Sequence, residues 1–259
     1  AHREELLDQA AAKILAINPE LKVSKEQADS YASLGSDVVV ASVPTLGREG
    51  SERIKRFSPD HFRVIVVDEA HHAAASTYRR ILDYFTPDLT LGVTATPQRG
   101  DNVRLSDVFD EVVFHYSILE GMKNDYLTKL IGYRLQTNTD ISSVKRSGDD
   151  YVVADLSKAV NTPERNKLVV DAYEEYLSDR PTFVFATDIA HAEDLQREFR
   201  SRNITSELIL GTTSILDRNM AFGRFRSKDV QVLINVGVLT EGIDEPSVSG
   251  IILARPIGS

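Results

Sequence analysis

The chain has 259 residues, of which 42% are hydrophobic and 27% charged, a composition typical of a folded globular protein with one large domain or two smaller ones. It contains no cysteine, which excludes a disulfide scaffold, a cysteine nucleophile and a thiolate metal site. The formal net charge is −9, and no apolar run approaches the roughly 18 residues that cross a bilayer. We therefore expect neither a polybasic binding protein nor a membrane-spanning one.

Short apolar strands alternate with amphipathic helical segments along the chain. Strands are predicted at residues 37–43, 63–67, 89–93, 182–186, 206–210, 230–236 and 248–253, and helices at residues 3–17, 76–85, 164–177, 190–202 and 216–225. This alternation predicts an α/β fold of doubly wound parallel sheets. The unbroken apolar runs at 64–67 and 251–253 further predict that both faces of these strands are covered.

The alternation weakens between about Phe114 and Asn161, where glycine, serine and aspartate collect. We therefore predict an N-terminal domain over residues 1–115, a connection over 116–161 and a C-terminal domain over 162–259. Only three predicted strands precede the connection, so the first domain lacks one or two strands of an ordinary doubly wound sheet.

Two carboxylates, Asp68 and Glu69, follow the strand at 63–67. Adjacent carboxylates at the end of a buried strand are costly to desolvate unless a cation compensates them. The pattern favours a nucleotide hydrolase, in which Asp68 holds Mg²⁺ through water and Glu69 deprotonates the attacking water. The alternative is that one of the two carboxylates only caps the following helical turn.

Two other polar groups carry weaker signals. His71 and His72 raise the hypothesis of a zinc site, but adjacent helical residues point to different faces and no histidine follows at i+4, which disfavours it. Thr94-Ala95-Thr96 follows the strand at 89–93 and, taken alone, is equally well an exposed turn closed by Pro97.

Together, these groups resemble the superfamily 2 DEAH-box helicases, which consist of two tandem RecA-like domains. Six segments in order, spanning almost the whole chain, carry the resemblance: Ala1-His2-Arg3-Glu4-Glu5-Leu6 (motif Ia), Ala41-Ser42-Val43-Pro44-Thr45-Leu46-Gly47-Arg48 (the next DNA-contacting motif), Asp68-Glu69-Ala70-His71 (motif II), Thr94-Ala95-Thr96 (motif III), Phe183-Val184-Phe185-Ala186-Thr187 (motif IV) and Leu239-Thr240-Glu241-Gly242-Ile243-Asp244 (motif V).

Finer features are most similar to one branch of the superfamily. These are His72 after the box, the Thr-Glu-Gly form of motif V, Asp188-Ile189-Ala190-His191-Ala192 and Asn161-Thr162-Pro163-Glu164-Arg165-Asn166. The branch is related to the translocating subunits of restriction enzymes and includes a fungal mitochondrial helicase of branched DNA. The resemblance thus suggests mitochondria as the location, with cytoplasm or nucleus as alternatives.

The resemblance implies a role for each matching residue. The cofactors would be ATP and Mg²⁺, with Asp68 and Glu69 at the metal and Glu69 as catalytic base. His71 would link the ATP site to Thr94 and Thr96, which couple hydrolysis to domain movement. The residues expected to bind the nucleotide from the second domain are Gly242 and Asp244, and those expected to line the nucleic-acid strand are Arg3, Thr45, Arg48, Thr187 and Thr240.

The two basic residues of this set, Arg3 and Arg48, also have a purely structural interpretation. Arg3 lies next to Glu4 and Glu5 in a first helical turn, where it is equally well a solvated surface residue. Arg48 could simply pair with Glu49 or Glu52.

Two elements of the helicase family are missing from these 259 residues. No glycine is followed by lysine, so the Gly-x-x-x-x-Gly-Lys-Ser/Thr phosphate loop is absent, and the sequence stops before the motif VI that supplies an arginine finger. We therefore expect the first RecA-like domain to be N-terminally incomplete and the second C-terminally incomplete. Since an arginine finger alone is worth about 10³ to 10⁵ in rate, we expect negligible ATP hydrolysis by this piece alone.

The resulting functional hypothesis is an ATP-dependent DNA helicase or translocase that moves along or unwinds duplex or branched DNA. The expected partner is nucleic acid, DNA rather than RNA, with no membrane and with protein partners left open. An RNA helicase and a catalytically inactive nucleic-acid-binding module are the alternatives.

Overall fold

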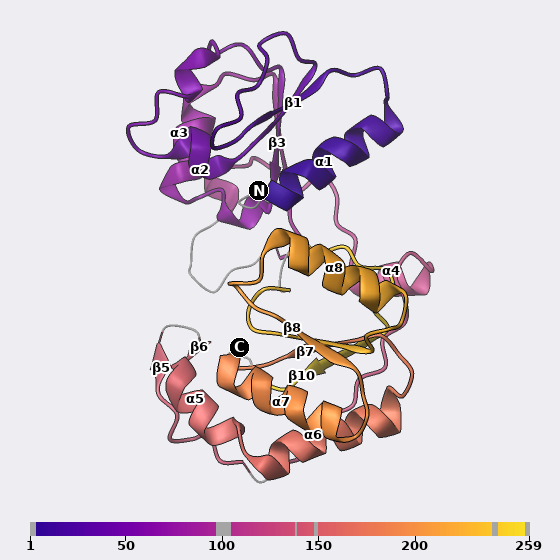
Figure 1. Ribbon diagram of the computed structural model, residues 1–259. Helices are drawn as coiled ribbons and strands as arrows, with labels where there is room; N and C mark the ends of the chain where they lie inside the picture. Colours follow the sequence, from indigo (N-terminus) through magenta and orange to yellow (C-terminus); the bar gives the residue numbers. More distant parts are fainter. Residues whose placement is uncertain (1–3, 97–104, 138, 148–149, 240–242, 257–259) are drawn as a thin grey trace. The chain divides into compact units, whose positions relative to one another are not determined.

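The computed structural model describes residues 4–96, 105–137, 139–147, 150–239 and 243–256 (Figure 1). The chain divides into two compact units, residues 1–130 and 131–259, and this division falls inside the segment predicted as a connection. None of the helices in the described ranges combines the length and apolar character of a membrane span.

The described residues of unit 1 contain four strands, arranged as two parallel pairs. The first pair is β1 (Val23–Glu26) with β2 (Val38–Ala41), and the second is β3 (Val64–Asp68) with β4 (Leu89–Val93). The sequence prediction missed β1, because Val-Ser-Lys-Glu contains a single apolar residue. The helical elements of unit 1 are α1 (Glu4–Ile17), α2 (Val43–Gly47), η1 (Ile54–Arg56), η2 (Ala70–His72), α3 (Ser76–Tyr84), η3 (Leu105–Asp107) and α4 (Ile118–Lys123).

One face of the β3–β4 pair packs on the core of unit 1. Ile65 and Val67 of β3 point to this side, where they meet the buried Tyr78 of α3 and Phe85 just after it. Phe57, completely buried, joins β2, η1 and α3 in the same core.

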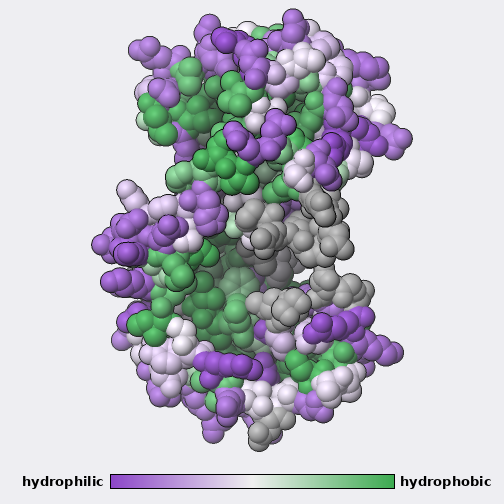
Figure 2. Space-filling model, turned by 180° about the vertical axis from the view of Figure 1, so that it is seen from behind, coloured by the Kyte–Doolittle hydropathy of each residue, from purple (hydrophilic) through white to green (hydrophobic). Residues whose placement is uncertain are grey.

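The opposite face of this pair is exposed. Val64 is paired with Leu89 and Val66 with Leu91, and these four side chains are 52%, 55%, 60% and 37% exposed. The prediction that both faces are covered is therefore wrong for the described part of unit 1, and Ile251 at 61% exposure shows the same in unit 2. An unbroken apolar run shows that neither face is polar, but it does not show which element lies over each face. Figure 2 shows apolar side chains reaching the surface of each unit.

Unit 2 is built on a four-stranded, wholly parallel sheet in the order β10-β7-β9-β8. Its elements are the short antiparallel pair β5 (Arg146–Ser147) and β6 (Asp150–Tyr151), α5 (Val153–Val160), α6 (Pro163–Tyr176), β7 (Thr182–Phe185), α7 (Ile189–Ser201), β8 (Ser206–Ile209), α8 (Ile215–Arg226), β9 (Val232–Asn235) and β10 (Gly250–Leu253). All four strands of this sheet were predicted from the sequence.

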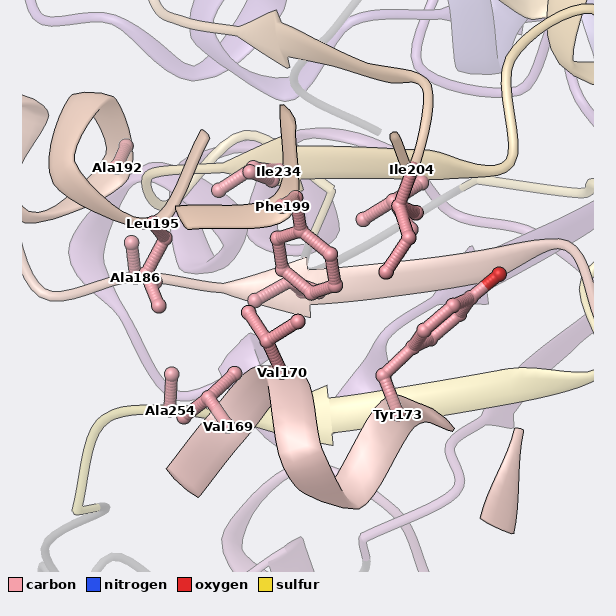
Figure 3. Close-up of a cluster of buried hydrophobic side chains, with 12 residues drawn as sticks. Val169, Val170, Tyr173, Ala186, Ala192, Leu195, Phe199, Ile204, Ile234 and Ala254 are labelled. Carbon is pink, nitrogen blue, oxygen red and sulfur yellow. The ribbon is translucent and has the colours of Figure 1, made fainter. Parts of the chain in front are cut away.

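Helices pack on both faces of the central strands β7 and β9, whose neighbouring residues point to opposite sides, whereas Ile251 and Leu253 of the edge strand β10 stay exposed. Val184 and Ile234 pack on one side with Tyr173 of α6 and Phe199 of α7, whose rings meet edge to face at 5.5 Å (Figure 3). On the other side, the buried Phe183 and Leu233 pack against Phe222 and Phe225 of α8. Unit 2 therefore has the doubly wound arrangement that the sequence predicts.

Candidate functional site

The predicted catalytic carboxylates lie where β3 ends. Asp68 is the last residue of β3, and Glu69 follows with φ 51° and ψ 48°, a left-handed conformation that is uncommon for a residue with a Cβ. The Glu69 N–H donates to Asp68 Oδ1 at 3.0 Å. Both side chains are exposed, so the turn presents two carboxylates at the carboxyl end of the strand.

His71 connects this turn to the end of β4. Its Nδ1 atom lies 2.9 Å from Thr94 Oγ1, 3.4 Å from Thr96 Oγ1 and 3.2 Å from Glu69 Oε2. The Thr96 N–H donates to Thr94 Oγ1 at 3.1 Å. Because β3 and β4 are parallel, with Asp68 opposite Val93, the segments after them emerge at the same edge. The structure thus brings together five of the predicted site residues of unit 1: Asp68, Glu69, His71, Thr94 and Thr96.

The packing beneath the turn explains how it is positioned. Ala70 is buried against β4 at Gly92, where an added Cβ would lie 2.9 Å from the Ala70 Cβ and 2.6 Å from Phe109 Cζ. Only glycine permits so close an approach. The Ala70 side chain is therefore packed directly against the neighbouring strand.

A row of rings extends from the turn into the core. The rings of His71 and His72 lie 4.1 Å apart, and His72 stacks on Tyr78 of α3 at 6.4 Å. Burial raises the pKa of the Tyr78 hydroxyl, and the negative charges of Asp68 and Glu69 raise it further. Tyr78 was not predicted from the sequence, because a single tyrosine near the start of a helix carries no functional signal.

The donor set suits a hard divalent cation rather than zinc. Within the described ranges, no three histidine, aspartate or glutamate side chains gather as a metal cluster. Mg²⁺ needs fewer protein ligands, since it keeps several waters and is completed by substrate phosphates. The exposed Asp68 and Glu69 carboxylates fit such a cation.

Two of the predicted strand-contacting residues lie on or directly after α2. Thr45 Oγ1 accepts a hydrogen bond from the Ala28 N–H at 3.2 Å, which leaves the hydroxyl proton for a ligand. Arg48 follows α2 and is exposed. The two acidic neighbours considered as its partners are taken, since Glu49 pairs with Arg80 and Glu52 with Lys55. Arg48 thus has no ion pair within the described residues, and Arg3 lies outside them.

In unit 2, Thr187 follows β7 but is only 3% exposed. Its N–H donates to Nδ1 of the fully buried His191 at 3.2 Å, and its Oγ1 lies 3.3 Å from the same atom. Both polar groups of Thr187 are therefore directed inward rather than towards a ligand. Asp244 is exposed, whereas Thr240 and Gly242 lie outside the described residues.

Unit 1 also contains a buried ion cluster that was not predicted from the sequence. Glu26, completely buried at the end of β1, pairs with Arg53 and Arg56 of the η1 region. Arg53 in turn lies beneath the ring of Tyr31, its guanidinium carbon 3.6 Å from the ring centroid. The only available signal was the i, i+3 spacing of the two arginines.

Comparison with known families identifies the two units. Residues 1–99 match the family described as "Type III restriction enzyme, res subunit", and residues 164–258 match "Helicase conserved C-terminal domain". The chain belongs to the superfamily 2 helicases. The order of the two matches agrees with the predicted order of helicase motifs.

The chain is also similar to individual proteins over nearly its whole length. It is 35% identical to the ATP-dependent helicase named IRC3 of Saccharomyces cerevisiae, over 100% of this chain and 38% of the relative. It is 30% identical to the mitochondrial ATP-dependent helicase named irc3 of Schizosaccharomyces pombe, over 95% of this chain and 41% of the relative. The chain thus spans about two fifths of the length of these relatives.

A solved structure confirms the fold. The HsdR subunit fragment of a type I restriction enzyme from Vibrio vulnificus matches 92% of this helicase chain and 44% of its own, with a TM-score of 0.63 at 21% identity. The resemblance to restriction translocases and to the mitochondrial branch, inferred from the motifs, is therefore confirmed at the level of family and fold.

Proposed function

We propose that the protein containing this chain is an ATP-dependent DNA helicase or translocase. The observation that carries the proposal is the acidic turn at Asp68 and Glu69, joined through His71 to Thr94 and Thr96. A turn with only a capping role would not need a half-exposed carboxylate in a left-handed conformation beside a nearly buried histidine. The names of the fungal relatives support the same activity.

In this proposal, the carboxylates divide the work of ATP hydrolysis. Asp68 would hold Mg²⁺ through water, and the bound cation would neutralise charge on the phosphates. Glu69 would orient the attacking water and take its proton on the side-chain carboxylate. The exposure of both groups lets a phosphate and a water approach them from solvent.

His71 would couple the position of the Glu69 carboxylate to the segment that follows β4. Its Nδ1 is within reach of both the catalytic carboxylate and the Thr94 hydroxyl, so a shift of Glu69 towards water changes the contacts of the segment after β4. We assign Thr94 and Thr96 to this coupling. Gly242 and Asp244 are carried over as nucleotide-contacting residues from the motif that they match.

Nucleic acid would be contacted through the phosphates, which positions a strand without reading its sequence. Arg48 supplies an exposed, unpaired positive charge among the described residues, and Thr45 a hydroxyl donor. Arg3, Thr187 and Thr240 are carried over on their motifs alone. We favour DNA over RNA because several relatives are restriction-enzyme subunits, although Dbp5 of S. cerevisiae, a solved neighbour at 16% identity, is bound to RNA.

We further propose a mitochondrial location, which the name of the Schizosaccharomyces pombe relative supports. Cell fractionation with a mitochondrial marker tests this independently of the activity. Exclusive recovery in the cytosol or nucleus would refute it.

The deciding experiment measures ATP turnover by the complete gene product with single-stranded DNA, forked DNA and matched RNA, beside a Glu69→Gln variant. We expect DNA-stimulated hydrolysis in the parent and a loss of at least about 100-fold in the variant, because the amide cannot accept the proton of water. ATP and DNA binding should persist in the variant.

Each alternative predicts a different result. Stimulation by RNA but not DNA would identify an RNA helicase. Strand binding without turnover in the parent would identify an inactive binding module. A Glu49→Gln variant is the matched control, because Glu49 is an exposed carboxylate in the same unit that pairs with Arg80 rather than with the site.

A further inference from the structure

The crossover between β1 and β2 is an unusual connection. These strands are parallel, and parallel strands are ordinarily joined through a helix that returns the chain to the starting edge. Here residues 27–37 make the return without one. An irregular segment of this kind has backbone groups that other parts of the protein must bind.

Two arginines fix this crossover to the protein. Arg53 donates from Nη1 to the Ala28 carbonyl and from Nη2 to the Ser30 carbonyl, each at 2.6 Å. Arg56 donates from Nη2 to the Ala32 carbonyl at 3.1 Å. Both arginines also bind the buried Glu26 carboxylate, which accepts the Ala32 N–H as well at 2.7 Å. The crossover is thereby held at the carbonyl groups of three alternate residues, Ala28, Ser30 and Ala32.

Tyr31 lies between two of these anchored residues and faces solvent. Its side chain is 63% exposed, while Arg53 and Arg56 lie 3.6 Å and 4.9 Å from its ring centroid. A rigid aromatic ring backed by cations retains an exposed surface at little cost in conformational entropy. The protein thus presents a fixed planar surface where the chain would otherwise be mobile.

The chemistry of the cluster selects an uncharged planar ligand over a phosphate. The donors of Arg53 and Arg56 are already directed to Glu26 and to the three carbonyls, so few are left for phosphate oxygens. Asp29, exposed and two residues before Tyr31 in sequence, adds a negative charge that repels a phosphate. What remains accessible is the ring of Tyr31.

The crossover is also tied to the proposed strand-contacting segment. The Ala28 N–H donates to Thr45 Oγ1 at 3.2 Å, so the anchored loop contacts α2 directly. A strand whose phosphates lie along Thr45 and Arg48 would bring its bases close to this loop.

We infer that Tyr31 is a nucleic-acid-binding residue that stacks on a base of the bound single strand. This inference rests on the proposed function, because it requires a strand at α2. Base–aromatic stacking has little sequence preference, which suits a protein that moves along a strand. Tyr31 thus adds a base contact to a set of residues that otherwise contacts phosphates.

The test measures the affinity of the full-length protein for a labelled single-stranded oligonucleotide by fluorescence anisotropy. We expect Tyr31→Ala to weaken binding by about 5-fold or more, and Tyr31→Phe to preserve it. On an otherwise identical strand of abasic sites, the parent and Tyr31→Ala should bind equally. Tyr126→Ala is the matched control, since Tyr126 is an exposed tyrosine of the same unit with no arginine stacked on it among the described residues.

The outcomes separate this inference from the proposed function. Failure of the parent protein to bind any strand would overturn the proposed function itself. Normal strand binding by Tyr31→Ala would overturn only the stacking role. An equal loss on normal and abasic strands would also overturn it, since the ring would then act on the backbone, on the fold or on a protein partner.

Discussion

At the turn after β3, Glu69 combines the proposed catalytic carboxylate with an unfavourable backbone conformation. Its left-handed φ of 51° costs a residue with a Cβ roughly 1–2 kcal/mol, a cost that glycine avoids. The position therefore retains a side chain that the fold alone would not select. Strain at such a residue is a common property of functional sites.

The strained backbone at position 69 predicts that glycine is more stable than alanine there, the reverse of their usual order. Glu69→Gly should be more stable than Glu69→Ala by about 1 kcal/mol, although both variants lose the carboxylate and with it ATP turnover. Urea unfolding measures the difference. Ala73, where φ is −59°, is the control, because there Ala73→Gly should lower the stability of the protein. If glycine were less stable than alanine at position 69 as well, the assignment of strain to Glu69 would be contradicted.

Arg48 is the second residue whose surroundings are informative, because its possible acidic partners are bound elsewhere. If it contacts a phosphate, Arg48→Gln should make the slope of log affinity against log salt shallower by about 0.7 for a single strand. A salt titration of strand binding measures the slope. Arg63→Gln is the control, because Arg63 precedes the opposite, amino end of β3 and pairs with Asp88. Equal slopes in the parent and Arg48→Gln would exclude the contact.

At the scale of elements, the first turn of α7 contains a titrating core residue. Asp188 caps α7 by accepting the His191 N–H at 2.8 Å, and His191 itself is buried beneath the cap. Burial lowers the pKa of the His191 imidazole to about 4 from an ordinary value of 6.5. The unfolded chain therefore binds a proton at a pH where the folded one does not.

The pH dependence of stability follows from this difference. The contribution of neutral His191 is complete above pH 6.5 and declines as the pH falls towards 4, with a loss of about 2 kcal/mol between pH 7 and pH 5. Hydrogen exchange of the β7 and β9 amides at the two pH values measures the effect in unit 2. A His191→Gln variant should lack this component, and an undiminished loss in that variant would assign it to other groups.

At the scale of the whole molecule, the strands and helices were largely predictable, because apolar periodicity reports them directly. The same holds for the residues of the acidic turn, which are contiguous in sequence. The cluster of Glu26, Arg53 and Arg56 was not predictable, since three charged residues up to 30 positions apart give no local pattern. The apolar sequence of β3 also did not indicate which of its faces is covered, since the apolar Val64 and Val66 are exposed.

Thr187 illustrates a different limit. Its motif indicates a strand contact, but its side chain is buried against His191, and motif matching reports the residue type without its orientation. His71 is the opposite case, since the structure places it 2.9 Å from the threonine to which the resemblance linked it. The roles of both residues remain predictions.

The close contact at Gly92 has a consequence for genetic variation in this protein. Gly92→Ala should lower the free energy of unfolding by about 1–3 kcal/mol and displace Ala70 and Phe109, reducing ATP turnover by the full-length protein. In a saturation mutagenesis screen, Gly92 would thus score like an active-site residue although it offers no group to any ligand. Gly132, where an added Cβ meets nothing within 4 Å, should accept the same change silently. A clinical or evolutionary survey that ranks positions by intolerance alone would therefore misread a packing constraint as chemistry.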